Sequence, residues 1–119
     1  MEKPNLIVDK TFHFSLMAIE LCNVLDERKK FAISNQLLRS ATSIVANVRE
    51  AQNAESESDF VHKLKIAAKE AEETMYWLDL CLYSPTYPNT ENEKTELLSI
   101  IRIINKIIGT IKTKHQLAN

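Results

Sequence analysis

The sequence predicts an all-α fold, an up-down-up-down antiparallel four-helix bundle that occupies residues 1–119 as a single domain. The 119 residues include one glycine and three prolines, and the turns and strand ends of β proteins draw heavily on both. Apolar residues recur along most of the chain at alternating steps of three and four, the spacing of one helix face. Short connections between the predicted helices make consecutive helices antiparallel.

The first helix is predicted over residues 10–30. Its basic end, Arg28 to Lys30, suits the negative end of a helix dipole. The spacing leaves two choices open at each of two positions. The expected inner face consists of Phe12, Leu16, Ile19, Cys22 or Asn23, and Leu25 or Asp26.

The second helix is predicted over residues 32–54 and carries the clearest pattern. Steps of four and three place six apolar residues on one side of it. A polar row formed by Arg39, Ser43, Asn47 and Glu50 runs beside them. The expected core residues are Ile33, Leu37, Ala41, Ile44, Val48 and Ala51.

The third helix is predicted over residues 57–82. Ser56 and Asp59 have the spacing of a capping box, in which a serine caps the helix and a later acidic side chain reaches back. The expected inner face consists of Phe60, Leu64, Ala67, Ala71, Leu78 and Leu82.

The fourth helix is predicted over residues 90–115. It follows a turn that Pro85 and Pro88 enforce, because proline removes backbone donors and disfavours helix in the residue before it. Thr90 and Glu93 have the spacing of a second capping box. The expected core residues are Leu97, Ile101, Ile104, Ile108 and Ile111.

This last helix has more apolar surface than a bundle member needs. A core-facing helix shows an apolar stripe of about 100°, and a broader one needs a second cover. We therefore expect a homo-oligomer in which the surplus, with Tyr76 and Trp77 of the third helix, packs against a neighbouring subunit. The alternative is that an off-axis crossing within one bundle covers it. The expected oligomer face consists of Leu98, Ile100, Ile103 and Ile107.

Composition and charge exclude several classes of protein. Hydrophobic residues make up 45% and charged residues 26%, as in ordinary globular proteins, and no run reaches the roughly 18 apolar residues of a membrane span. The first residues lack the pattern of a signal peptide, so we expect a cytoplasmic protein with no membrane partner. The net charge of −1 is not that of a dedicated nucleic-acid binder. Cys22 and Cys81 are expected to be reduced core thiols.

The sequence predicts no catalytic residues, no metal site and no cofactor. A di-iron centre in a four-helix bundle needs Glu-x-x-His pairs on two helices, and the one near match is Asp59 with His62. The chain has no recognisable nucleophile with its base and no glycine-rich phosphate loop. We therefore do not expect an enzyme.

Arg39 has two interpretations. It either contacts an anion or forms an ion pair with an acid such as Glu50, Glu70 or Glu73. We favour the ion pair, because an unpaired buried charge is costly.

The neighbouring polar and aromatic residues have similar alternatives. Ser40, Ser43 and Asn47 either meet a partner or let two helices approach closely. Tyr76 and Trp77 either stack on bases or divide between core and subunit contact. We favour the structural interpretation of both groups.

Basic residues are concentrated in the last helix, where residues 97–119 include no acid. Such charges form either a solvated face or a polyanion-binding patch. Copies of a weak patch on an oligomer would act together. The candidate polyanion-binding residues are Arg102, Lys106, Lys112 and Lys114.

The chain resembles the bacterial 23S ribosomal RNA intervening-sequence proteins over most of its length, most strongly over residues 37–82. Val48 replaces the usual isoleucine, and Ala51 stands where glycine is common. The pattern is carried by Leu38, Arg39, Ser40, Ala41, Ser43, Ile44, Asn47 and Glu50 in the second helix, and by Asp59, Phe60, Leu64, Ile66, Ala67 and Glu73 in the third.

The resemblance implies a four-helix bundle that assembles into a ring-like homopentamer. It also connects the chain to accessory proteins of diversity-generating retroelements, which bind a reverse transcriptase and nucleic acid and are markedly basic, unlike this chain. We expect a non-enzymatic scaffold or adaptor for a nucleic-acid-processing partner. The alternative is direct RNA or DNA binding by the basic residues of the last helix, and a bundle that binds a small ligand or metal is a third interpretation.

Overall fold

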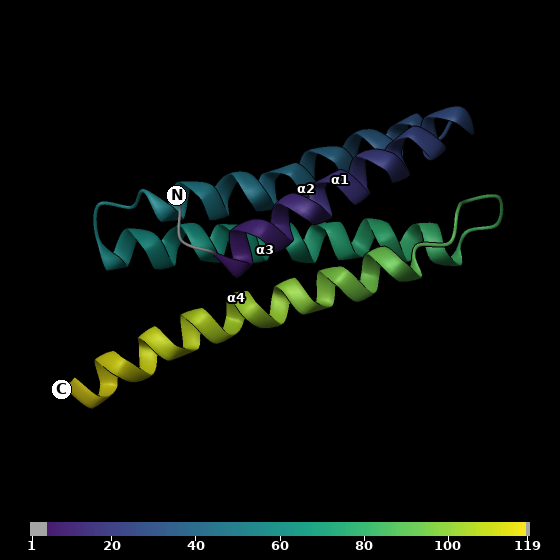
Figure 1. The fold of residues 1–119 in the computed structure, drawn as a ribbon. Coiled ribbons are helices and arrows are strands. Elements are labelled where there is room, and N and C mark those ends of the chain that lie inside the picture. Colours follow the sequence, from purple (N-terminus) through teal and green to yellow (C-terminus); the bar gives the residue numbers. More distant parts are fainter. Residues whose placement is uncertain (1–4, 119) are drawn as a thin grey trace.

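The computed structural model describes residues 5–118 and contains four α-helices and no strand in that part of the chain. The all-α four-helix prediction is confirmed (Figure 1). Residues 1–4 and 119, the ends of the expected domain, lie outside the described residues. The helices are α1 (Leu6–Glu27), α2 (Phe31–Gln52), α3 (Glu57–Tyr83) and α4 (Glu91–Ala118).

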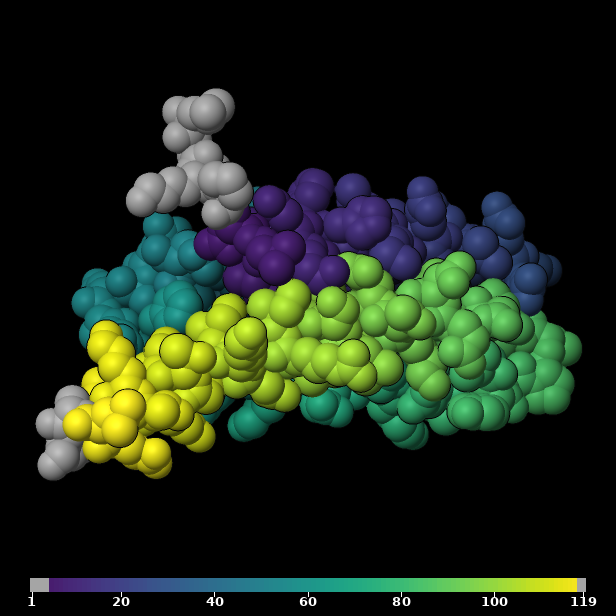
Figure 2. All heavy atoms as spheres, turned by 60° about the horizontal axis from the view of Figure 1, so that its bottom comes forward, coloured from purple at the N-terminus to yellow at the C-terminus, as the bar shows by residue number. Residues whose placement is uncertain are grey.

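The helices pack around one elongated core. Each of the pairs α1 and α2, α2 and α3, α3 and α4, and α1 and α4 is in contact. Figure 1 shows that the chain reverses its direction at each of the three connections. The molecule measures 54 × 31 × 20 Å, and α4 lies along its near face in Figure 2. Among residues 5–118, none of the four helices contains an apolar stretch of the length that a membrane span requires.

The ends of α1 differ from the prediction because of two local motifs. The Asn5 side chain accepts a hydrogen bond from the Val8 N–H, so the helix begins at Leu6. At the other end, Lys29 has a φ of 61°, and the Lys30 N–H donates to the Leu25 carbonyl at 2.8 Å. This Schellman closure ends the helix before the basic cluster.

Of the two predicted capping boxes, one forms in part. Ser56 Oγ accepts from the Asp59 N–H at 3.0 Å, as expected, while the Asp59 carboxylate accepts from the preceding Glu55 N–H. The Thr90–Glu93 box is wrong. The Thr90 hydroxyl is buried and donates to the Leu78 carbonyl at 2.7 Å, which ties the start of α4 to α3.

The expected core of α2 is confirmed almost completely, since five of its six residues are buried and Ile33 is half-buried. In α3, the two ends of the expected face, Phe60 and Leu82, are half-buried. The members of the two predicted faces that are fully enclosed are Leu37, Ala41, Ile44, Val48 and Ala51 in α2, and Leu64, Ala67, Ala71 and Leu78 in α3.

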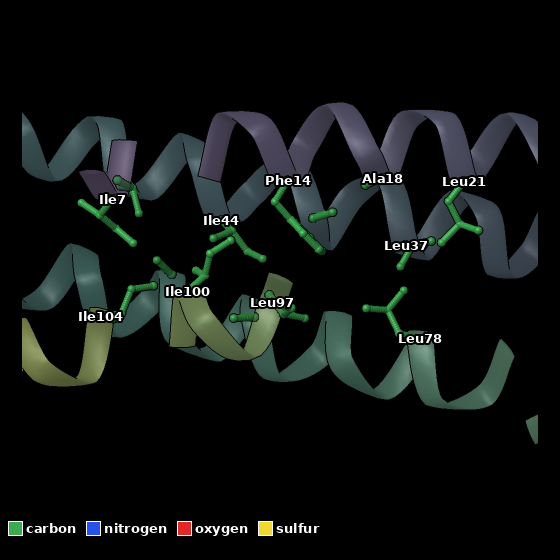
Figure 3. Packing of buried hydrophobic residues seen from close by; sticks show 14 of the residues in the cluster. Ile7, Phe14, Ala18, Leu21, Leu37, Ile44, Leu78, Leu97, Ile100 and Ile104 are labelled. Atoms are coloured by element: carbon green, nitrogen blue, oxygen red, sulfur yellow. The ribbon is translucent and has the colours of Figure 1, made fainter. Parts of the chain in front are cut away.

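The predicted inner face of α1 is largely wrong. Phe12, Leu16 and Ile19 are exposed, whereas Cys22 and Leu25 are buried as one of the alternatives expected. The inner face that the structure shows includes two buried hydroxyl residues, Thr11 and Ser15. They can be buried because each hydroxyl donates a hydrogen bond to a carbonyl of its own helix. Figure 3 shows the core side chains of the true face, which include Ile7, Phe14, Ala18 and Leu21.

The expected oligomer face on α4 also needs correction. Ile100 is fully buried between the helices (Figure 3), so it cannot contact a second subunit of the folded bundle. Ile103 and Ile107 are half-buried against the same core, and Leu98 alone of the four is exposed, at 44%. The crossing of α4 over the core therefore covers most of its isoleucines. Of its expected core residues, Leu97, Ile104 and Ile108 are buried, and Ile101 and Ile111 are half-buried.

Candidate interaction surfaces

The polar row of α2 meets α3 through an ion-pair cluster. Arg39 Nη1 lies 3.2 Å from Glu70 Oε2, and Arg39 Nη2 donates to Glu73 Oε2. The indole N–H of Trp77 donates to the same Glu73 oxygen at 3.1 Å. Glu50, the third candidate partner of Arg39, lies instead 3.7 Å from Lys63 Nζ.

These contacts change the acidity of the groups they join. The Trp77 indole N–H and the Arg39 guanidinium lower the pKa of Glu73, because both stabilise its carboxylate. The Glu73 carboxylate in turn raises the pKa of Arg39. The cluster connects α2 to α3 at the surface of the protein, since the Arg39 side chain remains 48% exposed.

The other polar residues of α2 satisfy their hydrogen bonds close to the backbone. The Ser43 hydroxyl donates to the Arg39 carbonyl at 2.7 Å, and the Asn47 amide donates to the Ser43 carbonyl at 2.8 Å. Ser40 is buried, and its Oγ lies 2.8 Å from Thr74 Oγ1 of α3. Of these three residues, Ser40 is the one that forms a hydrogen bond between α2 and α3 among the described residues.

Two aromatic residues of α3 face different surroundings. The rings of Tyr76 and Trp77 lie 5.0 Å apart at an angle of 58°, with Trp77 half-buried and Tyr76 exposed. Tyr76, Leu80 and Tyr83 follow helical steps of four and three, and all three are exposed. We call these three residues the tyrosine patch.

A larger apolar area covers the outside of α1 and α2. Phe12, Leu16 and Ile19 share one face of α1, and the Arg49 guanidinium of α2 lies 5.3 Å from the Phe12 ring centroid. Eleven residues make about three helical turns, so Leu38 shares the face of Arg49. The contact of Arg49 with Phe12 therefore indicates that the exposed faces of α1 and α2 are on the same side of this helix pair. The α1–α2 apolar surface consists of Phe12, Leu16, Ile19, Phe31 and Leu38.

The four candidate polyanion-binding residues of α4 are all exposed, but they do not form one row. Lys106 and Lys114 line a hollow on α4, whereas Lys112 lines a groove between α4 and α3. At about 100° per residue, Lys112 lies about 120° around the helix from Lys106 and about 160° from Lys114. The structure thus divides the expected patch.

The groove between α3 and α4 contains a group of residues that the sequence analysis did not connect. Its volume is about 610 Å³. At one end, His115 Nε2 bonds to Glu57 Oε1, and Lys114 Nζ lies 3.6 Å from Glu57 Oε2. These two groups lower the pKa of Glu57. The residues that give the groove its chemistry are Glu57, Val61, His62, Lys65, Ile111, Lys112 and His115.

The described residues 5–118 contain no cluster of three or more His, Cys, Asp or Glu side chains that could hold a metal ion. Both cysteines are buried free thiols, as predicted. Burial raises the pKa of Cys81 to about 11 and also raises that of Cys22, so neither thiol ionises readily near neutral pH.

Comparison with known proteins places the chain in a family. Residues 3–110 match the model of the 23S rRNA-intervening sequence proteins. The fold is similar to the crystal structure of a protein of unknown function from the S23 ribosomal protein family of Bacteroides thetaiotaomicron. The TM-score is 0.81 at 39% sequence identity, over 86% of this chain and 97% of that one. A search of curated protein sequences gave no match. The chain therefore belongs to the 23S rRNA-intervening sequence protein family.

Proposed function

We propose that this chain is a non-enzymatic scaffold that works in the cytoplasm as a homo-oligomer of up-down-up-down bundles, closed into a ring of five. The observation that carries the proposal is the α1–α2 apolar surface. Soluble monomers rarely expose contiguous apolar patches, and larger ones mark interaction sites. Phe12, Leu16 and Ile19 form such a face although buried residues were expected there.

The tyrosine patch supports a ring in preference to a dimer. A two-fold dimer joins a surface to itself, whereas a ring joins two different surfaces of each subunit. This chain has a second group of exposed apolar residues on α3, a different helix from the two that carry the first. The ring number of five comes from the resemblance to the family. An assembly of this kind would present repeated copies of its outer residues to a nucleic-acid-processing partner.

Two leucines of similar exposure test the assembly. Leu16 on the α1–α2 apolar surface is 48% exposed, and Leu98 on α4 is 44% exposed. We expect Leu16→Gln to shift the light-scattering mass of the purified protein toward one chain, and Leu98→Gln to leave it unchanged. A wild-type protein that stays monomeric across micromolar concentrations would refute the scaffold proposal.

Direct RNA or DNA binding is the second candidate, and the exposure of the four candidate cations of α4 favours it. Lys106 and Lys114 are exposed and line the same hollow of α4, and Arg102 precedes Lys106 by about one helical turn. Phosphate contacts release counterions, so this binding would weaken steeply with salt. Nucleic acid that copurifies at low salt and separates at moderate salt would support this candidate.

A further inference from the structure

The groove between α3 and α4 has an excess of groups that can carry positive charge. Lys65 and Lys112 line it from opposite helices, and His62 and His115 add two imidazoles. Among the described residues that line the groove, Glu57 is the one acidic residue, and it is already engaged by His115 and Lys114. Both lysines are exposed, and no carboxylate lies within 4.0 Å of either Nζ among the described residues. An incoming anion would therefore meet two cations that no carboxylate of residues 5–118 occupies.

The same groove has an apolar part. Val61 of α3 and Ile111 of α4 are half-buried and line the groove together with the charged side chains. Ligand sites for small molecules commonly have volumes of about 300–1,000 Å³ and combine apolar walls with a few polar groups. The volume of about 610 Å³ falls in this range.

We propose that the α3–α4 groove binds a small phosphorylated molecule of nucleotide size. Lys65 and Lys112 contact the phosphate, to which lysine ammonium groups donate charge-assisted hydrogen bonds. The ring system lies on Val61 and Ile111. The site is separate from the apolar surfaces of the proposed assembly and does not depend on them.

Glu57 has a second role in this proposal, as a built-in competitor for the phosphate. Its carboxylate holds His115 and Lys114 at one end of the groove. Removing the negative charge at this position frees His115, which lines the groove, for the ligand, and it also removes a charge that would repel a phosphate. Glu57→Gln should therefore bind the ligand more tightly than the wild type does, by about threefold for an exposed charge.

The test uses the full-length protein and titration calorimetry with adenosine 5′-monophosphate, inorganic phosphate and adenosine. We expect one adenosine 5′-monophosphate to bind per chain, with a higher affinity than either inorganic phosphate or adenosine. Lys65→Ala and Lys112→Ala should each weaken binding several-fold. Lys69→Ala is the matched control, because Lys69 is exposed one turn from Lys65 and outside the groove.

Glu55→Gln is the control for Glu57→Gln, since it makes the same change of net charge outside the groove. Circular dichroism of each variant separates lost binding from lost folding. The proposal is overturned if the monophosphate does not bind, if Lys69→Ala weakens it as much as Lys65→Ala does, or if Glu55→Gln tightens binding as much as Glu57→Gln does. It is also overturned if a short oligothymidylate binds in the groove and the monophosphate does not.

Discussion

At the scale of single residues, Gly109 is a position where a substitution should make the folded chain more stable. It lies exposed within α4, and a Cβ atom built there meets nothing within 4 Å. Glycine within a helix costs about 0.5–1 kcal/mol relative to alanine. Gly109→Ala should therefore raise the free energy of unfolding in urea by about that amount. Ala46→Gly is the control: at an exposed position within α2, it should lower the free energy of unfolding by a similar amount. A Gly109→Ala variant that is less stable than the wild type would contradict the open space around Gly109.

Two adjacent leucines of α2 should differ sharply. Leu37 is fully buried and Leu38 is 40% exposed. Leu37→Ala leaves a cavity and should cost about 2–5 kcal/mol of the free energy of unfolding. Leu38→Ala should cost much less, and its main effect should be on the mass of the assembled particle. Urea unfolding followed by circular dichroism measures the first difference, and equal losses would show that the burial pattern of α2 is wrong.

Residue burial shows where sequence reasoning succeeds and where it fails. In α2, the spacing is consistent with only one apolar face, so the residues that this helix buries are predictable from the sequence. In α1, Phe12, Leu16 and Ile19 have the same spacing as the buried Phe14, Ala18 and Leu21. Periodicity cannot choose between two faces that are both apolar. The buried face is the one that carries Thr11 and Ser15, whose hydroxyls bond to their own helix and so tolerate burial.

At the scale of helices, the Arg39 cluster between α2 and α3 predicts a response to acid. The pKa of Glu73 is lowered from the ordinary value of 4.5 by Trp77 and Arg39. A carboxyl group with a lowered pKa in the folded state stabilises that state above its ordinary pKa and loses this effect as the pH falls through the lowered value. The free energy of unfolding should therefore decrease as the pH falls below 4.5.

Two substitutions on α3 test whether the Arg39 cluster causes this loss of stability in acid. Glu73→Gln should make the acid loss smaller, because the group that titrates is absent. Glu72→Gln, at the exposed neighbouring position, should leave the loss as it is in the wild type. If the two variants show the same pH profile, the cluster does not couple α2 to α3.

Helix existence was predictable, but the ends depended on contacts that spacing does not reveal. The Ser56 cap is predictable because its hydroxyl accepts a hydrogen bond from the N–H of Asp59, which is only three residues later in the chain. Thr90 was assigned the wrong partner, since its hydroxyl bonds to Leu78 in the preceding helix. The end of α1 was also missed, because Lys29 takes a left-handed conformation that usually indicates glycine.

At the scale of the whole molecule, the α3–α4 groove could not be predicted from the sequence. His115 and Glu57 are separated by 58 positions, and their contact depends on how far α4 extends along α3. Figure 2 shows the yellow end of α4 at the same end of the molecule as the teal residues that precede α3. Sequence reasoning grouped the α4 cations by position in the chain. The fold divides them, because Lys112 lies in the groove while Lys106 and Lys114 line another hollow.

Salt distinguishes the two kinds of contact proposed for the whole particle. Burial of the α1–α2 apolar surface does not depend on counterion release, so the assembled mass should persist as salt rises from about 50 to 500 mM. Phosphate contacts weaken over that range, in proportion to the number of cations that make them. The two properties can therefore be separated in one series of light-scattering runs with absorbance recorded for protein and nucleic acid.

Lys106→Ala makes this comparison specific. In a ring, one substitution removes the same cation from every subunit, so a nucleic-acid complex should lose much of its affinity and show a shallower dependence on salt. The mass of the ring itself should not change, because Lys106 is outside both apolar areas. Lys69→Ala on α3 is the matched control and should leave both quantities as they are. If Lys106→Ala dissociates the particle instead, α4 takes part in assembly, and the interface must extend beyond the apolar surface of α1 and α2.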